Sequence, residues 1–258
     1  MAPTIHLVRH AQGYHNVKLE NQWLPDPDLT ELGRGQCEKL CATFPFHDQV
    51  THLIASPIRR TLYTCKLSFG PAVVKLAKIL ALPDAQEVSL YPCDIGTEPS
   101  ALNEEFGDLV DLHLVQPGWN KKTPESRWYP DAQKLDARAR DARISLREIA
   151  KEAGDDAHIV LVSHGGILHF ITGDWQGIEA GAGTGWENTE YRSYHFADKT
   201  WADPNATLKE LPESRARRDL SAPLDETEHR QLRAAFEVHL QKEVKICLDK
   251  IANQQSRI

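Results

Sequence analysis

The sequence predicts a three-layer α/β/α sandwich with a mostly parallel central sheet. Three short, largely apolar runs, at residues 5–8, 50–55 and 158–163, have the length and β-branched content of buried strands. Segments with the 3.6-residue periodicity of amphipathic helices, at 30–44 and 135–153, lie between them. Strands that alternate with helices form parallel sheets, and the unbroken apolar run of the third strand indicates a central position covered on both faces.

The first of these strands delivers Arg9 and His10 at its carboxyl end, and a loop with Gly13 and Asn16 follows. In open α/β sheets, ligands bind at the carboxyl ends of the strands. A guanidinium group suits phosphate or carboxylate oxygens, and an imidazole can be a nucleophile, a proton carrier or a metal ligand. The function that Arg9 and His10 indicate depends on which residues follow the neighbouring strands.

One helix is expected before the second strand in the sequence and another after it. Thr30 can cap a helix whose apolar residues fall at positions 37, 40, 41 and 44. Ser56 and Pro57 follow the second strand and are typical of an N-cap and a first helical residue. That helix would place Arg60 in its first turn, where free backbone N–H groups and the helix dipole favour an anion.

The middle of the chain is less regular. We expect a helix over 70–84 that ends in a Pro-Asp turn, and a strand over 86–91 that carries Glu87. Asp94 lies on the loop that follows. Residues 92–134 are interpreted as an excursion of loops and helix over the site, inserted into one domain that spans residues 1–258.

His164 and two glycines follow the third strand, and the glycines permit a tight turn and close backbone approach to a ligand. A glycine-rich segment at 181–188 is expected to form a mobile loop, and 191–197 and 207–211 are expected to be edge strands. A final helix at about 225–256 begins with a capping-box pattern and is expected to dock on the body.

The composition excludes several classes of function. A formal net charge of −7 argues against a protein that binds nucleic acid by bulk attraction to phosphates. No apolar run approaches the ~20 residues that span a bilayer, so we expect no membrane partner and a cytoplasmic location, with a nuclear one still open. The five cysteines form no zinc-ligand spacing and the twelve histidines no HExxH pattern, so we expect no metal site.

Four motifs, in the family's order and within residues 4–170, resemble signatures of the histidine phosphatase superfamily, which has the phosphoglycerate-mutase-like fold. Their counterparts here are Arg9-His10-Ala11 for Arg-His-Gly, residues 29–36 for Leu-Thr-x-x-Gly-x-x-Gln, residues 56–64 for Ser-Pro-Leu-x-Arg-Ala-x-x-Thr, and residues 162–166 for Val-x-His-Gly-Gly. The segments from residue 87 onward resemble a fungal phosphoglycerate-mutase-like branch. The alanine after His10 adds one methyl group where the family has glycine.

The resemblance implies a phosphatase that acts on a small phosphorylated metabolite without a metal or a cofactor. A phosphate monoester resists a nucleophile because its negative oxygens repel it, so cationic groups must first neutralise that charge. His10 would attack phosphorus and form a phosphohistidine, while Arg9, Arg60 and His164 would hold the phosphoryl group.

The leaving oxygen needs a proton, best supplied by a carboxylic acid with a raised pKa. Glu87 matches the family's position for this donor, and Asp94 is the second candidate. Asn16 either contacts the phosphate or closes its loop, and both interpretations stay open. Arg59 is expected to be a solvated helix residue, and His15 to be structural.

Other functions stay open beside hydrolysis. A phosphoglycerate mutase shares the first half-reaction but returns the phosphoryl group to a bound acid. A scaffold, or a pocket repurposed for biosynthesis, would keep the fold without this turnover. Residues 92–134 would set specificity, with Lys121, Lys122 and Arg127 available to a charged substrate. The oligomeric state is open.

Overall fold

The computed structural model describes residues 2–178, 184–218 and 222–255. The expected glycine-rich loop at 181–188 therefore lies partly outside the described residues. In the described chain, one seven-stranded sheet has the order β4-β3-β2-β5-β1-β6-β7. Its strands are β1 (Thr4–Arg9), β2 (Val50–Ala55), β3 (Ile79–Ala81), β4 (Val110–Asp111), β5 (His158–Ser163), β6 (Tyr191–Phe196) and β7 (Leu208–Glu210).

The first five strands of this order pair in parallel, and β6 and β7 add to the edge in antiparallel fashion. The predicted parallel sheet is thus confirmed, and so are the strands expected at 191–197 and 207–211. Only β7 is an edge strand, because β6 pairs with β1 on one side and with β7 on the other. The helices that accompany the sheet are α1 (Glu31–Thr43), α2 (Arg59–Ser68), α3 (Gly70–Leu76), α4 (Pro99–Phe106), α5 (Ala132–Ala153), α6 (Gly165–Thr172), α7 (Pro212–Ala216) and α8 (Glu226–Gln255).

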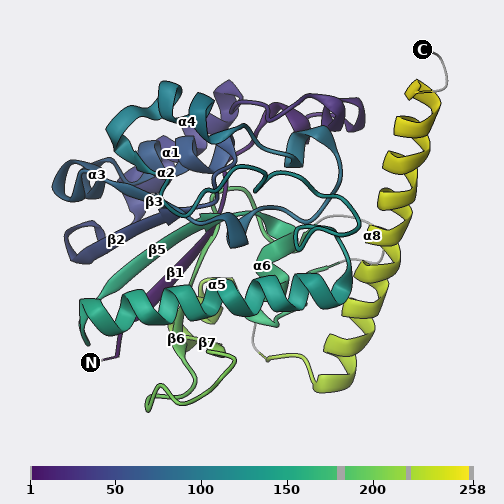
Figure 1. Ribbon diagram of the computed structural model, residues 1–258. Helices are drawn as coiled ribbons and strands as arrows, with labels where there is room; N and C mark the ends of the chain where they lie inside the picture. Colours follow the sequence, from purple (N-terminus) through teal and green to yellow (C-terminus); the bar gives the residue numbers. More distant parts are fainter. Residues whose placement is uncertain (1, 179–183, 219–221, 256–258) are drawn as a thin grey trace.

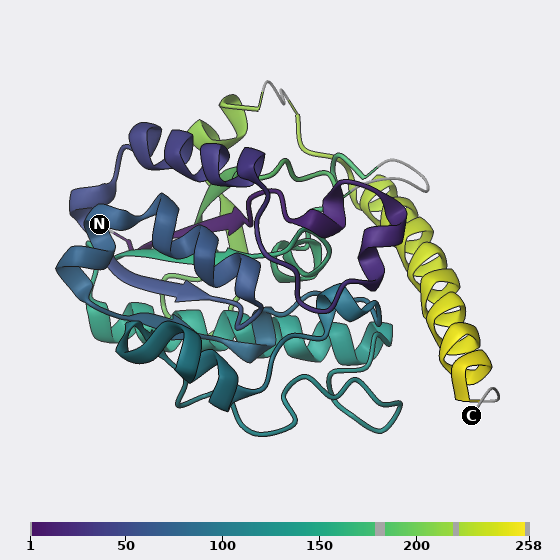
Figure 2. The ribbon, with the colours of Figure 1, turned by 90° about the horizontal axis from the view of Figure 1, so that it is seen from above.

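Helices cover both faces of the sheet, as Figures 1 and 2 show. The central strand β5 explains why, because its side chains alternate between two cores. Ile159 and Leu161 pack against α5 and α6, whereas Val160 and Val162 pack against α1, α2 and α4 on the other face. All four side chains are fully buried, which accounts for the unbroken apolar run in the sequence. The predicted three-layer arrangement is confirmed.

The expected helix over 70–84 is wrong in its second half. Helix α3 ends at Leu76, and Ala77 takes a left-handed conformation with φ 58°. The chain then enters the sheet as β3, whose Ile79 and Ala81 are fully buried. A strand of three residues is too short to show a period in the sequence, so the apolar positions resemble an extension of the helix.

The expected strand over 86–91 is also wrong, because these residues pair with no strand of the described chain. The excursion at 92–134 contains α4, and it also supplies β4, which extends the sheet beyond β3. Ser56 is not the cap of α2: that helix begins at Arg59 with Ile58 as its N-cap.

The C-terminal helix agrees with its prediction. The Asp225 carboxylate accepts from the backbone N–H of Glu228 at 2.8 Å, and the Glu228 side chain accepts from the Asp225 N–H at 2.8 Å, which is the predicted capping box. Helix α8 lies at one side of the rest of the protein in Figure 1. Its own residues Leu240 and Cys247 are buried. No helix among the described residues is long and apolar enough to cross a membrane.

Candidate active site

The carboxyl ends of β1, β2 and β5 bring the predicted residues together. In the parallel register Arg9 lies opposite Ser163 and Ala55 opposite Val162, so the residues that follow each strand meet at one edge. The ring centroids of His10 and His164 are 5.2 Å apart. Both imidazoles are almost completely buried, at 2% and 0% exposed.

His10 is held as a neutral ring with a free nitrogen. Its Nδ1 lies 2.7 Å from the Ala11 carbonyl oxygen, which can only accept, so Nδ1 carries the proton. Nε2 therefore keeps its lone pair. Burial, followed by the charges of Arg60, His15 and Arg9, holds the pKa of His10 well below its ordinary value. An unprotonated imidazole nitrogen is the form that can act as a nucleophile.

The loop after His10 is hydrogen-bonded to two of the motif segments, residues 56–64 and 29–36. The Ala11 N–H donates to Thr64 Oγ1 at 3.0 Å, and the Gln12 N–H donates to Gln36 Oε1 at 2.8 Å. A Cβ atom on Gly33 would lie 2.1 Å from the Gln12 carbonyl oxygen, so only glycine fits there. Thr30 caps α1 beside this loop, as predicted, by accepting from the Gly33 N–H. These motif residues thus hold the loop that aims His10.

Arg60 is the centre of a buried network and is 1% exposed. Its guanidinium donates to the Cys93 carbonyl at 2.6 Å, to Asp94 Oδ1 at 2.7 Å and to His164 Nδ1 at 2.9 Å. Because His164 Nδ1 accepts, its Nε2 carries the proton and donates to Ser56 Oγ at 2.9 Å. Burial and Arg60 hold the pKa of His164 well below its ordinary value.

Asp94 is the ion-pair partner of Arg60. Its second carboxylate oxygen accepts from Ser89 Oγ at 2.6 Å. Burial raises the pKa of Asp94, but Arg60 and Lys122 outweigh burial, so the pKa lies below its ordinary value. The structure therefore places an ionised carboxylate at Asp94.

Glu87 sits across the N-terminus of α6. Its carboxylate accepts from the backbone N–H groups of Gly166 at 3.1 Å, Ile167 at 3.0 Å and Val88 at 2.9 Å. A Cβ atom on Gly166 would lie 2.6 Å from Glu87 Oε1, so the second glycine of the Gly-Gly pair makes room for this carboxyl. Burial and the negative charge of Asp94 raise the pKa of Glu87 and outweigh the hydrogen bond from Gly166 and the charge of Arg60.

The segment 184–190 forms the wall beside Arg9. Arg9 Nη1 donates to the carbonyl oxygen of Trp186, and its buried Nε has no partner within the described chain. Asn188 Nδ2 donates to the His10 carbonyl at 2.9 Å. Arg192 Cζ lies 3.7 Å from the centroid of the Trp186 ring, so this cation–π contact stabilises the segment.

Asn16 closes its own loop. Its Oδ1 accepts from the Gly13 N–H at 3.1 Å, and its own N–H donates to the Gly13 carbonyl at 2.9 Å. The side chain is exposed. These bonds are those of the loop-closing interpretation, and a contact of Asn16 with phosphate stays a prediction.

Two further residues lie near the site: His15, which is expected to be structural, and Glu243, which has no signal in the sequence. The His15 ring lies 5.3 Å from that of His10, and burial lowers its pKa to about 3. Glu243, on α8, faces the same region: burial and the charges of Asp94 and Glu87 raise its pKa to about 7. It lies far along the chain from every motif, so only the docking of α8 reveals it.

Arg127 and Lys122, two of the residues expected to meet a charged substrate, bond to other parts of the protein. Arg127 pairs with Asp84 at 2.7 Å and with Asp141 at 2.6 Å. Lys122 is 7% exposed and donates to backbone carbonyls instead. Arg59 is only partly solvated, because its guanidinium pairs with Glu105 at 2.8 Å. Among the residues that the structure describes, no group of three or more His, Cys, Asp or Glu side chains could hold a metal ion.

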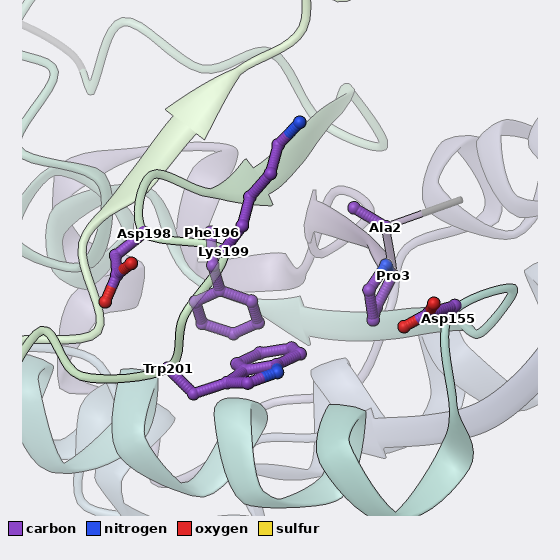
Figure 3. A pocket seen from close by; sticks show the side chains of 7 residues that line it. All are labelled: Ala2, Pro3, Asp155, Phe196, Asp198, Lys199 and Trp201. Atoms are coloured by element: carbon purple, nitrogen blue, oxygen red, sulfur yellow. The ribbon is translucent and has the colours of Figure 1, made fainter.

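A separate cavity of about 320 Å³ lies at the opposite, amino-terminal edge of the parallel strands. Figure 3 shows its floor, where the rings of Phe196 and Trp201 lie 5.5 Å apart and the Lys199 side chain extends away from them. Pro3 and Asp155, each just before a strand, line its other side. This cavity is therefore distinct from the His10 site.

Comparison with known proteins supports the family that the motifs indicate. The model of the histidine phosphatase superfamily (branch 1) matches residues 5–203. Phosphoglycerate mutase-like protein 1 of Arabidopsis thaliana is 39% identical over 77 residues, which cover 26% of this chain and 27% of that protein. Phosphoglycerate mutase-like protein 2 of the same plant is also 39% identical over 77 residues, which cover 26% of this chain and 22% of that protein. The match thus spans about a quarter of each relative.

Solved structures share the fold at low sequence identity. The ecdysone phosphate phosphatase of Bombyx mori, solved with tungstate, has a TM-score of 0.56 at 14% identity, over 81% of this chain and 92% of that chain. Mycobacterial hydrolase 1 has a TM-score of 0.51 at 18% identity, over 81% and 97% of the two chains. YhfR of Bacillus stearothermophilus has a TM-score of 0.51 at 17% identity, over 83% of this chain and 97% of that chain. The family model, the fold and the four motifs agree, and the chain belongs to the histidine phosphatase superfamily (branch 1).

Proposed function

We propose that the protein is a phosphatase that hydrolyses a small phosphorylated metabolite through a phosphohistidine at His10, without a metal. The observation that carries this proposal is the free Nε2 of His10, held neutral beside the buried guanidinium of Arg60. A neutral nucleophile next to a fixed cation is the arrangement that attack on a negatively charged phosphate monoester requires.

In the first step, His10 Nε2 forms a bond to phosphorus as the bond from phosphorus to the leaving oxygen breaks. The protonated carboxyl of Glu87 gives its proton to that oxygen, so the product leaves as a neutral alcohol. Glu87 suits this role better than Asp94, because the pKa of Glu87 is raised and that of Asp94 is lowered.

In the second step, water attacks the phosphohistidine and Glu87 accepts its proton, which restores the neutral ring of His10 and releases inorganic phosphate. Arg9 and Arg60 hold the phosphoryl oxygens in both steps. His164 Nδ1 accepts from Arg60 in this structure. The charge of a phosphoryl group would favour a proton on that nitrogen, which would then donate to the group.

The pH dependence of kcat/KM is expected to report Glu87. The rate should fall as pH rises through the raised pKa of Glu87, because only the protonated carboxyl donates. The lowered pKa of His10 keeps the nucleophile neutral at acid pH. In Glu87→Gln, kcat/KM for phenyl phosphate should fall about 10²-fold and lose this alkaline limb. The ionisation of the substrate itself is common to both proteins, so an identical limb in Glu87→Gln would contradict the assignment.

The direct test incubates the wild-type protein with p-nitrophenyl phosphate and a panel of phosphorylated metabolites, and measures both inorganic phosphate and isomerised products. Release of phosphate is expected. Conversion of a phosphoglycerate to its isomer without phosphate release would indicate a mutase instead. Folded protein that turns over no member of the panel would overturn the proposal in favour of a scaffold or a repurposed pocket.

A further inference from the structure

The segment that carries Glu87 has no partner strand, so its backbone must be held in another way. Buried carbonyl groups need donors. Lys122 Nζ donates to the carbonyls of Glu87 at 2.7 Å and Ser89 at 2.9 Å. Arg138 Nη2 donates to the carbonyl of Gln86 at 3.0 Å. Two buried cations, from the excursion and from α5, thus supply the donors that a neighbouring strand would otherwise supply.

Lys122 and α6 hold different parts of Glu87. The Glu87 carboxyl is held by N–H groups of α6, while its backbone carbonyl is held by Lys122. A glutamate side chain has several rotatable bonds, so a fixed backbone as well as a bonded carboxyl is needed to keep that carboxyl at one place. Lys122 is 7% exposed, and burying a lysine is costly unless its ammonium is well bonded.

We propose that Lys122 is a positioning residue for Glu87, and that its bonds to the Glu87 and Ser89 carbonyls hold the proton donor where it meets the leaving oxygen. This inference rests on the proposed phosphatase function. It assigns Lys122 no contact with substrate, which distinguishes it from a lysine that binds a charged metabolite.

Two phosphate esters of nearly the same size test the proposal. The phenol that leaves phenyl phosphate has a pKa near 10, like a tyrosine side chain, and its oxygen needs a proton as it departs. The much more acidic phenol of p-nitrophenyl phosphate leaves without one. In Lys122→Met, kcat/KM for phenyl phosphate should fall by about 30- to 100-fold, and kcat/KM for p-nitrophenyl phosphate by less than about threefold. This ratio covers the reaction only as far as departure of the leaving group, so the later hydrolysis step, which Glu87 also serves and which both esters share, does not enter it.

Two further variants calibrate this result. Glu87→Gln should show the same selective loss of kcat/KM on phenyl phosphate, because it removes the donor itself. Lys75→Met is the matched control: Lys75 Nζ also donates to two backbone carbonyls, those of Asp48 and Val50, but between α3 and β2. Its kcat/KM should be unchanged with both esters.

Equal losses of kcat/KM on both esters in Lys122→Met would overturn the proposal, because a general structural defect slows attack on both esters alike. If Lys122→Met does not fold, Lys122→Gln keeps N–H donors without the charge. It should show a smaller selective loss on phenyl phosphate, and equal losses or none would again overturn the inference. Wild-type protein without turnover would instead overturn the phosphatase function itself.

Discussion

Replacing His10 with alanine is expected to lower kcat for p-nitrophenyl phosphate by about 10⁴-fold or more, because the attacking atom is removed. The cause is chemical rather than structural. The two-step route through a phosphohistidine no longer exists, while the backbone bonds that hold the loop, such as that from Ala11 to Thr64, remain. Phosphate release under saturating substrate measures the loss, and a thermal melt of the variant checks its fold.

A histidine outside the site serves as the control for this variant. His52 lies on β2 and its ring contacts Thr51 Oγ1. We expect His52→Ala to keep the wild-type kcat. Substantial turnover by His10→Ala would show that another group attacks phosphorus, and would refute the central role of His10.

Replacing Arg60 with alanine is expected to lower both stability and activity. Asp94 would stay buried without its guanidinium partner, and breaking such a pair costs about 3–5 kcal/mol of unfolding free energy. The phosphoryl group would lose one of its cations, so kcat/KM should fall about 10²- to 10³-fold. Urea unfolding and initial rates measure the two effects separately.

The double variant Arg60→Ala, Asp94→Asn distinguishes these two effects. It removes the uncompensated carboxylate, so part of the lost stability should return while kcat/KM stays low. The neighbouring Arg59, which pairs with Glu105 away from this network, is the matched control. Arg59→Ala should keep kcat/KM near wild type. Recovery of activity in the double variant would contradict a role for Arg60 in binding the phosphoryl group.

The parts of the fold that the sequence predicts are those with local signals. Strand β5 is buried on both faces, so its pattern is an unbroken apolar run, and the helices α1 and α8 carry their caps in adjacent residues. Parallel topology alone then brings the carboxyl ends of these strands to one edge of the sheet. That is why the sequence alone predicts Arg9, His10 and His164 at one edge of the sheet.

The parts that escape prediction depend on contacts between distant residues. The segment 86–91 alternates like a strand, yet its donors are Lys122 and Arg138, which lie more than thirty residues away in the sequence. No local pattern records that arrangement. The pairing of Asp94 with Arg60 and the approach of Glu243 on α8 are of the same kind, because each depends on packing that the finished fold creates.

The most direct test of the account is to capture the intermediate. Wild-type protein mixed with a phosphate ester carrying labelled phosphorus, and denatured in alkali within one turnover, should hold the label on the peptide that contains His10. Because phosphorus bonded to a histidine nitrogen is lost in acid, the label should also disappear on acid treatment. Rapid turnover with no label on that peptide, or with the label on another residue, would contradict a phosphohistidine at His10.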